Sequence, residues 1–576
     1  MLLKALLLFL VAHIDSVLSL NNTPGPQCRC LFSDPSCWPP ADEFDSLSHQ
    51  LSQPLISPVP PESACYPPSN PSGNCTNVIL NSANGNWRAN QSGSMESFNF
   101  ETFIFANGSI SACYLNTSLG VPCEQGSVPP IGVDARSAQD VQAAVAFAVK
   151  WNLKVVIKST GHDLLGRSSG RGSFMIWTHN MKNISFDANF IPEGGPHNET
   201  FNELALTLGA GIQWNEAYAA GESYGRVIVG GTSFGESVGA ASGYVLGGGH
   251  SVLSPTYGLA VDNVLQFTLV TSSASVLTVN AYSHPDLFWA LRGGGGGTFG
   301  VVTSVTYNTH PPTPATLILL SVENFSSGAI AQSVVSKFLS LHPTLADLQW
   351  GGIASFDSSF FSFSGVAPDT TLAESNAAIQ PFVDFVRNAT AGSGETVQFS
   401  TVPFDSVYVL YDAYIASLGG AASSSAGLNG ELVSRLFPRE LLETEYEKVA
   451  DTLLGLGDLV SYVLAGGGAV SKVDPNSLGL NPAWRKALGH AILAGGWADG
   501  TNATGIHQVE NQLKGYLAVL EELASLYEKN FQQTFFGDHY ARLESIKDIY
   551  DPVDLFVVIE GVGSERWDEL LDCRKA

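Results

Sequence analysis

The groups best suited to chemistry are concentrated in a polar loop at residues 158–171. Glycines let the backbone approach a ligand closely, and hydroxyl and free N–H groups can form a concavity that binds anions. The charged groups of the loop are three cations and one carboxylate: Lys158, Arg167, Arg171 and Asp163. Because the whole chain has a net charge of −26, such a basic loop predicts a site for an anionic cofactor. The alternative is an ordinary turn rich in Gly and Ser, capped by His162.

Two strands and a helix are predicted to position this loop. Apolar runs at residues 155–157 and 174–177 predict buried strands on either side of it. Before them, Ser137 is the predicted N-cap of a helix that ends at Asn152. The apolar face of this helix repeats at helical spacing: Val141, Ala144, Val145, Ala148 and Val149.

Two further segments, 226–271 and 286–303, are rich in glycine and other small residues. Small side chains over many positions indicate backbone packed tightly against something flat or extended. The glycine run at 293–297 is not a dinucleotide fingerprint, because it follows a predicted helix at 285–292 and precedes a predicted strand at 301–307. The fingerprint has the reverse order.

The sequence GHDLLGRSSG, preceded by the helix DVQAAVAFA, resembles the flavin-binding loop of the vanillyl alcohol oxidase/p-cresol methylhydroxylase (PCMH) superfamily. The best match is its fungal berberine bridge enzyme-like branch, and the resemblance covers most of the chain. It implies an FAD cofactor bound covalently through His162 to the 8α carbon of the flavin. It also implies further cofactor-binding residues: Lys158, Ser159, Thr160, Gly161, Asp163, Gly166, Arg167, Ser168, Gly230, Gly231, Thr232, Ser237, Gly239, Gly243, Gly247, Gly248, Gly249, His250, Val302, His539 and Tyr540.

The resemblance also implies an α+β fold with a two-part PCMH-type FAD-binding domain at residues 123–312. An α+β substrate domain follows at 313–525, where helical stripes alternate with strand-like runs, so we expect an antiparallel sheet faced by helices. Residues 526–576 are expected to return to the FAD-binding domain. Residues 20–122 read as an N-terminal extension pinned by disulfides, with little regular structure and no catalytic role.

Candidate catalytic and substrate-binding residues are predicted from their places in strands of the substrate domain and in the motifs of the resembled family. Three side chains in or beside strands of the substrate domain are candidates to contact the substrate: Tyr462, His490 and Trp497. Relatives place an N-Y-x-R-L motif near the flavin, and here the asparagine position is His539, followed by Tyr540. The tyrosine that serves many relatives as base is replaced by Leu520. We therefore expect Tyr540 or His539 to be the base, the alternative being that His539 only substitutes for the asparagine.

The N-terminus and the composition predict export. Residues 1–19 have a basic start and a short apolar run typical of a signal peptide, and no other segment is predicted to cross a membrane. Ten N-glycosylation sequons begin at Asn21, Asn74, Asn90, Asn107, Asn116, Asn183, Asn198, Asn324, Asn388 and Asn502. The strongly acidic charge argues against nucleic acid or an anionic membrane as partner. We expect a secreted, N-glycosylated monomer with no metal site.

Eight cysteines fit an oxidising compartment. Spacing predicts local disulfides Cys65–Cys75 and Cys113–Cys123. The remaining four allow three pairings, and we favour Cys573 joined to one of Cys28, Cys30 and Cys37. With no cysteine between Cys123 and Cys573, a second, cysteinyl bond to the flavin is not expected.

The leading functional prediction is an oxidase that transfers electrons from a small organic substrate (an alcohol, a sugar or a secondary metabolite) through FAD to O2, giving H2O2. Two alternatives remain open. Loss of the usual base could leave a non-catalytic glycoprotein that keeps FAD as structure. The G-x-S-x-G pattern at residues 231–235 could instead mark a serine esterase acting through Ser233.

Overall fold

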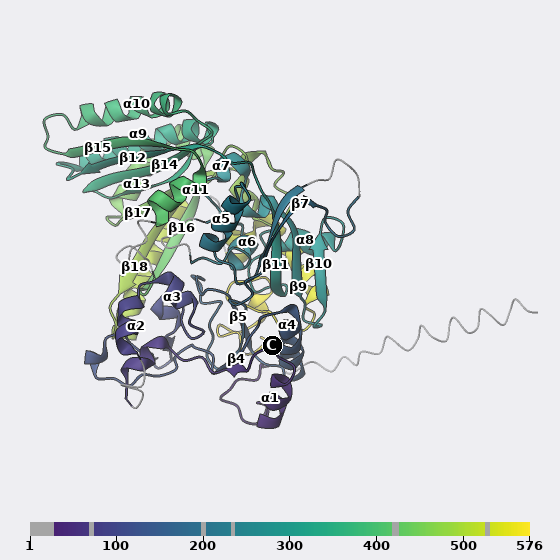
Figure 1. The fold of residues 1–576 in the computed structure, drawn as a ribbon. Helices are drawn as coiled ribbons and strands as arrows, with labels where there is room; N and C mark the ends of the chain where they lie inside the picture. The colour runs from purple at the N-terminus through teal and green to yellow at the C-terminus, as the bar shows by residue number, and fades with distance from the viewer. Residues whose placement is uncertain are drawn as a thin grey trace, which may run out of the picture.

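The computed structural model describes residues 28–67, 74–196, 203–231, 237–416, 426–524 and 530–575. Three sheets organise this part of the chain, and the short helices α1, α2 and α3 of the N-terminal extension lie in the lower part of the view in Figure 1. The signal peptide predicted at residues 1–19 lies outside the described residues. No helix within the described ranges combines the length and apolar character that a membrane span requires.

The first sheet carries the predicted cofactor loop. Its strand order is β1 (Leu55–Ile56), β4 (Ile131–Asp134), β6 (Phe174–Trp177) and β5 (Val155–Lys158). Strands β4, β6 and β5 run parallel, so the loop from β5 to β6 begins at the carboxyl end of β5. Helix α4 (Ala138–Lys150) makes the crossover between β4 and β5, and its predicted cap is confirmed because Ser137 accepts a hydrogen bond from the Asp140 N–H.

The second sheet carries the glycine-rich segments. Its order is β10 (Val276–Asn280), β9 (Val264–Val270), β11 (Val301–Asn308), β8 (Glu203–Gly209) and β7 (Ile184–Phe190). The helices around it are α5 (Trp214–Ser223), α6 (Gly243–Leu246), α7 (Ser254–Tyr257) and α8 (Pro285–Leu291). As predicted, α8 precedes the glycine run and β11 follows it.

The third sheet is antiparallel throughout. Its order is β15 (Thr396–Phe404), β12 (Ala315–Glu323), β14 (Phe360–Pro368), β13 (Gly351–Phe356), β17 (Val460–Leu464), β18 (Ala487–Trp497) and β16 (Asn429–Pro438). Its helices are α9 (Gly328–Asp347), α10 (Leu372–Ala389), α11 (Val407–Leu410), α12 (Arg439–Thr444), α13 (Tyr446–Gly455) and α14 (Ala503–Ala524). Apolar side chains from this sheet and from most of these helices form one continuous core. The structure thus confirms the predicted α+β class with an antiparallel sheet faced by helices.

The N-terminal extension contains α1 (Ala41–Ser48), α2 (Cys75–Asn81), α3 (Gly85–Ala89), β2 (Phe103–Ile104) and β3 (Ile110–Ser111). It reaches the substrate domain directly. Ser97 forms a bridge with Leu428, and the Gly430 N–H donates to Asn99 at 3.2 Å. Strands β16 and β18 descend toward α2 and α3 in Figure 1, so the extension braces the edge of the large sheet.

The C-terminal segment packs on the FAD-binding domain through α15 (Phe531–Phe536) and α16 (Tyr540–Tyr550). Lys547 is fully buried, ion-pairs with Asp551 at 2.8 Å and donates to the carbonyls of Thr298 and Phe556. Thr298 directly follows the glycine run, so this contact fixes the end of that run against the C-terminal segment.

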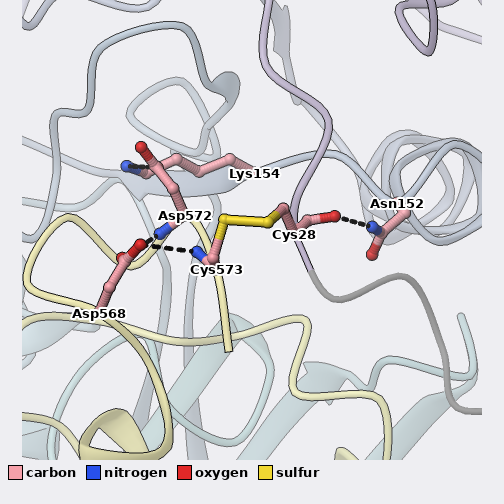
Figure 2. The surroundings of a disulfide bond; sticks show 6 residues. All are labelled: Cys28, Asn152, Lys154, Asp568, Asp572 and Cys573. Atoms are coloured by element: carbon pink, nitrogen blue, oxygen red, sulfur yellow. Dashed lines mark hydrogen bonds and ion pairs between the residues drawn. A yellow bond between two sulfur atoms is a disulfide. The ribbon is translucent and has the colours of Figure 1, made fainter. Parts of the chain in front are cut away.

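Four disulfides use all eight cysteines. The two predicted local bonds, Cys65–Cys75 and Cys113–Cys123, are confirmed. Cys573 pairs with Cys28, and Cys30 pairs with Cys37. Figure 2 shows that Asn152 donates to the Cys28 carbonyl and that Asp568 accepts from the Cys573 N–H, so polar contacts hold both ends of the chain at this bond.

Removing the Cys28–Cys573 bond by a paired Cys28→Ser, Cys573→Ser change should lower the free energy of unfolding by about 2–5 kcal/mol, because the bond restricts the unfolded chain over a separation of 545 residues. The matched control is removal of Cys113–Cys123, which spans only ten residues and should have the smaller effect. Thermal unfolding followed by circular dichroism measures both. Equal losses in the two variants would contradict this expectation.

Candidate active site

Hydrogen bonds within the loop fix the conformation of the segment that carries His162. Asp163 accepts hydrogen bonds from the N–H groups of Leu165 at 2.9 Å and Arg167 at 2.7 Å, which closes a tight turn. Gly161 has φ +90°, a conformation that other residues rarely adopt. The side chain of Arg167 donates to the carbonyls of Ile559 and Glu560. The loop is therefore rigid at both ends and attached to the C-terminal segment.

His162 is partly buried and its Nε2 lies 2.7 Å from Ser237 Oγ. Burial lowers the pKa of the imidazole to about 4, so the ring is neutral at mildly acidic and neutral pH. A neutral imidazole keeps a nitrogen lone pair, which is the form that can bond to carbon. The site therefore presents an intact nucleophile at the position predicted for covalent attachment.

Lys158 and Arg171 of the loop donate to backbone carbonyls, whereas the sequence predicted a basic site for an anionic cofactor. The Lys158 ammonium is fully buried and donates to the carbonyls of Gln91 at 2.6 Å and Ser92 at 3.1 Å. Burial lowers its pKa to about 7. Arg171 donates to the Gly126 carbonyl and lies 4.8 Å from the ring of Phe105. The Lys158 ammonium therefore holds the N-terminal extension, and its predicted contact with the cofactor stays a prediction.

A cavity of about 300 Å³ lies where the FAD-binding domain, the large sheet and the C-terminal segment meet. The loop contributes Leu165 and Arg167, and one wall consists of glycine backbone: Gly247, Gly293 and Gly295. A side chain at Gly293 would collide, since a Cβ there would lie 2.3 Å from the Leu480 Cα. The two glycine segments also touch, with the Gly295 N–H donating to the Leu246 carbonyl at 2.9 Å. Glycine backbone leaves this part of the lining without side chains, which suits the close approach of a flat isoalloxazine ring, so the residues fit FAD.

The other predicted cofactor residues fall into four groups. Ser159, Thr160, Gly161, Gly166, Gly239, Gly243, Gly248 and Gly249 lie in the two segments around this wall and in the His162 loop, and Ser168 lies in the same loop. Gly230 and Gly231 pack on Trp214, whose ring would meet any Cβ there. Val302 is a core residue of β11 and does not line the cavity. Thr232 lies outside the described residues, as does Ser233 of the alternative esterase pattern.

The opposite wall comes from the large sheet. His490 in β18 lines the cavity, and its neighbour across the ladder is Leu436 in β16, which also lines it. Tyr462 pairs with Ala491, one residue further along, and therefore points to the other face of the sheet. There it is fully buried and contacts His342 Nδ1 at 2.9 Å. The prediction that Tyr462 contacts the substrate is wrong.

Trp497, the third substrate candidate, lines a separate cavity of about 120 Å³ between the extension and the large sheet. His490 is the only one of the three candidates at the main cavity. It lies 5.8 Å from the ring of His250 and 5.8 Å from that of Trp484, centroid to centroid. Burial lowers the pKa of His490 to about 3 and that of His250 to about 4, so both rings are neutral. Trp484 was missed, although its position beside a proline in NPAW signals a fixed turn.

His539 and Tyr540 do not line the main cavity. Tyr540 donates to Glu565 and accepts from the Gly563 N–H, and burial together with Glu565 raises its pKa. A phenol with a raised pKa is a weaker source of phenolate, so the structure gives no support to Tyr540 as base. His539 is buried, and its Nδ1 lies 3.0 Å from the carbonyl of Leu480, a cavity residue. Leu520 is fully buried in the core of the substrate domain.

His539→Asn should leave the rate of anaerobic flavin reduction within about threefold of wild type, because the imidazole supports Leu480 from behind and an amide can donate the same bond. Its pH profile should also be unchanged. Stability should fall by about 1 kcal/mol, the usual contribution of one hydrogen bond. A large rate loss with a shifted pH profile would instead assign His539 to the chemistry, as the motif position allows.

Two family models match the chain. "FAD binding domain" matches residues 129–280, which contain the His162 loop and the first glycine segment. "Berberine and berberine like" matches residues 518–563, which contain α15 and α16.

Relatives match almost end to end. An uncharacterized FAD-linked oxidoreductase of Arthroderma benhamiae is 37% identical over 98% of this chain and 99% of its own length. A VAO-type flavoprotein oxidase of Thermothelomyces thermophilus is 32% identical over 96% and 95%. The crystal structure of a VAO-type flavoprotein from Myceliophthora thermophila superposes with a TM-score of 0.83 at 30% identity, covering 94% of this chain and 98% of the other.

These findings make FAD the cofactor and an oxidoreductase the class of enzyme, which removes the support for an esterase or a non-catalytic flavin carrier. They agree with the glycine wall and with the α+β fold. The chain belongs to the berberine bridge enzyme-like branch of the vanillyl alcohol oxidase/p-cresol methylhydroxylase family of FAD-linked oxidoreductases.

Proposed function

We propose that this protein is a secreted oxidase that holds FAD covalently through His162 and oxidises a small hydroxylated molecule, with O2 as electron acceptor and H2O2 as product. The observation that carries the proposal is the cavity between the glycine wall and His490, with the His162 loop at its rim. When bound there, FAD supplies the two-electron acceptor. The residues of the chain bind and orient the substrate and accept its proton.

The lining of the cavity favours a compact apolar substrate with few polar groups. Large apolar side chains dominate it: Leu436, Leu480, Trp484, Phe535 and Phe536. Two polar groups at the cavity are bonded within the protein. Arg167 donates to the Ile559 and Glu560 carbonyls. Asn481 donates to the Thr534 carbonyl and accepts from the Ala483 N–H. Among the lining residues, His490 is the neutral imidazole that faces the glycine wall. A hydroxylated aromatic or alicyclic metabolite fits this lining better than a sugar does.

The chemistry of the chain supports attachment through histidine alone. The glucooligosaccharide oxidase of Acremonium strictum carries a 6-S-cysteinyl, 8α-N1-histidyl FAD. Here every cysteine is in a disulfide, so no thiol is available for a second bond. His162 is the neutral nucleophile in the loop at the cavity rim.

Secretion is supported by the signal-type N-terminus, the four disulfides and the sequons. Asn107, Asn116 and Asn324 of these sequons have exposed side chains. Heterologous secretion followed by glycosidase treatment tests this part: a drop in mass and a new N-terminus near residue 20 are expected. A protein retained in the cell with its full N-terminus would contradict it.

The function itself is tested with purified protein. A flavin absorption spectrum is expected, and it should be bleached anaerobically by a substrate and restored by air. A screen of hydroxylated aromatic and alicyclic compounds against oligosaccharides, followed by peroxide formation, identifies the substrate class. Bleaching without peroxide formation in air would keep the oxidoreductase and exclude O2 as its acceptor.

A further inference from the structure

The N-terminal extension brings a carboxyl group to His162. Glu96 is buried, and its Oε1 lies 3.7 Å from the His162 Nε2. Its backbone is fixed on both sides, because the Glu96 N–H donates to the Gly161 carbonyl at 3.0 Å and the Glu96 carbonyl accepts from the Gly427 N–H at 2.7 Å. The extension, the FAD-binding domain and the substrate domain therefore meet at this residue.

Both carboxyl oxygens of Glu96 are buried and have no hydrogen-bond partner among the described residues. A buried polar group without a hydrogen-bond partner destabilises the folded protein, so the presence of Glu96 at this position needs an explanation. The room for it comes from Gly85: a Cβ at that position would lie 2.3 Å from Ser237 Oγ and 3.0 Å from Glu96 Oε2. Gly85, Glu96 and Ser237 thus form a pocket around one edge of the imidazole.

Among the described residues, the nearby cations make no hydrogen bond to this carboxyl group, although the charges of Arg88 and Lys158 oppose the rise in its pKa. Arg88 pairs with Glu62 at 3.3 Å and with Glu101, while the Lys158 ammonium donates to two backbone carbonyls. Burial raises the pKa of Glu96 to about 8, so the group is mostly neutral beside a neutral imidazole. A positive charge on the imidazole would favour the carboxylate and create an ion pair.

Covalent attachment creates such a charge. Nε2 faces Ser237 and Glu96, which leaves Nδ1 to bond to the 8α carbon. The new C–N bond breaks one C–H bond and leaves the imidazole positively charged until its N–H proton departs. The two electrons pass to the flavin ring and then, with the two protons, to O2, which becomes H2O2. A buried positive charge without a partner would oppose this reaction.

We propose that Glu96 positions His162 and balances the charge that its imidazole acquires when FAD becomes covalently attached. This role rests on the proposed histidyl attachment. It gives the extension a part in cofactor maturation, in place of the purely structural part predicted from its sequence. Glu96 is a positioning residue, because it acts on His162 and not on the substrate.

The experiment measures the rate at which FAD becomes covalently attached, not the rate at which substrate is oxidised. Protein made under riboflavin limitation is mixed with FAD in air, and the flavin fluorescence of the denatured gel band is followed with time. Glu96→Gln should slow attachment by at least about tenfold, the effect expected from losing one charge-assisted contact, while binding of dissociable FAD is retained. Glu96→Asp, which keeps the charge, should be faster than Glu96→Gln.

Glu62→Gln is the matched control, because it removes a carboxyl group from the same buried cluster but on the Arg88 side. It should attach FAD at the wild-type rate, with thermal unfolding reporting any loss of stability. Equal slowing in Glu62→Gln and Glu96→Gln, or a wild-type rate in Glu96→Gln, would overturn the role of Glu96 alone. Wild-type protein whose flavin is all released on denaturation would overturn the histidyl attachment itself.

Discussion

His162→Ala should abolish flavin that survives denaturation, while FAD still binds reversibly. The imidazole is the attachment point in the proposed function, and the remaining contacts come from the glycine wall and the backbone of the loop. These contacts do not depend on the His162 side chain, so the fold should persist. The measurement is flavin fluorescence of the acid-precipitated protein beside that of the supernatant.

His179→Ala is the control for this change. His179 is also a buried histidine with a lowered pKa, and its Nε2 lies 3.0 Å from Asn90, away from the main cavity. It should keep denaturation-resistant flavin even if its stability falls. Fluorescence that stays with the His162→Ala polypeptide would assign the attachment to another residue.

Much of the fold follows from local sequence patterns. The helix stripe at 138–150 and the apolar runs on both sides of the His162 loop fall where they were predicted, because each pattern has the period of its element. The tight backbone packing predicted for the two glycine-rich segments is also present, because a run of small side chains lets neighbouring backbones approach closely. The strand-like run at 350–363 in the substrate domain forms two strands, β13 and β14, joined by a turn in which Asp357 accepts from the Ser359 N–H.

The site residues were harder to predict than the fold. Which of them reach the cavity depends on the face of the strand on which each side chain lies and on contacts between residues far apart in the sequence. The sequence VSYVL of β17 is apolar on both faces, so it does not show which way Tyr462 points. The sequence of strand β16, NGELVSRLFP, shows no clear strand pattern, because it mixes charged with apolar residues on an edge strand. Glu96 lies 66 positions before His162 in an irregular segment, and no local pattern reveals such a contact.

The largest effect on the chemical step is expected from His490. Of the three predicted substrate residues it is the one that lines the main cavity, opposite the glycine wall. Oxidation of a hydroxyl group needs an acceptor for the hydroxyl proton as the hydride departs. The customary tyrosine is absent, since Leu520 is in the core, and Tyr540 is bonded to Glu565. Among the lining residues, the neutral imidazole of His490 can accept this proton. A pKa lowered to about 3 makes it a weak base, however, so its loss should have an effect at the low end for general bases.

His490→Ala should therefore slow anaerobic flavin reduction by about a hundredfold, the lower range for loss of a general base. Because burial holds the His490 pKa near 3, its acceptor form is present from mildly acidic to neutral pH, and the wild-type rate should show no loss around pH 6.5. Tyr462→Phe is the matched control, since Tyr462 lies on the adjacent strand but on the opposite face. It should lose stability and keep its rate. Equal rates in His490→Ala and wild type would show that the proton leaves by another route, through water or a group outside the described residues.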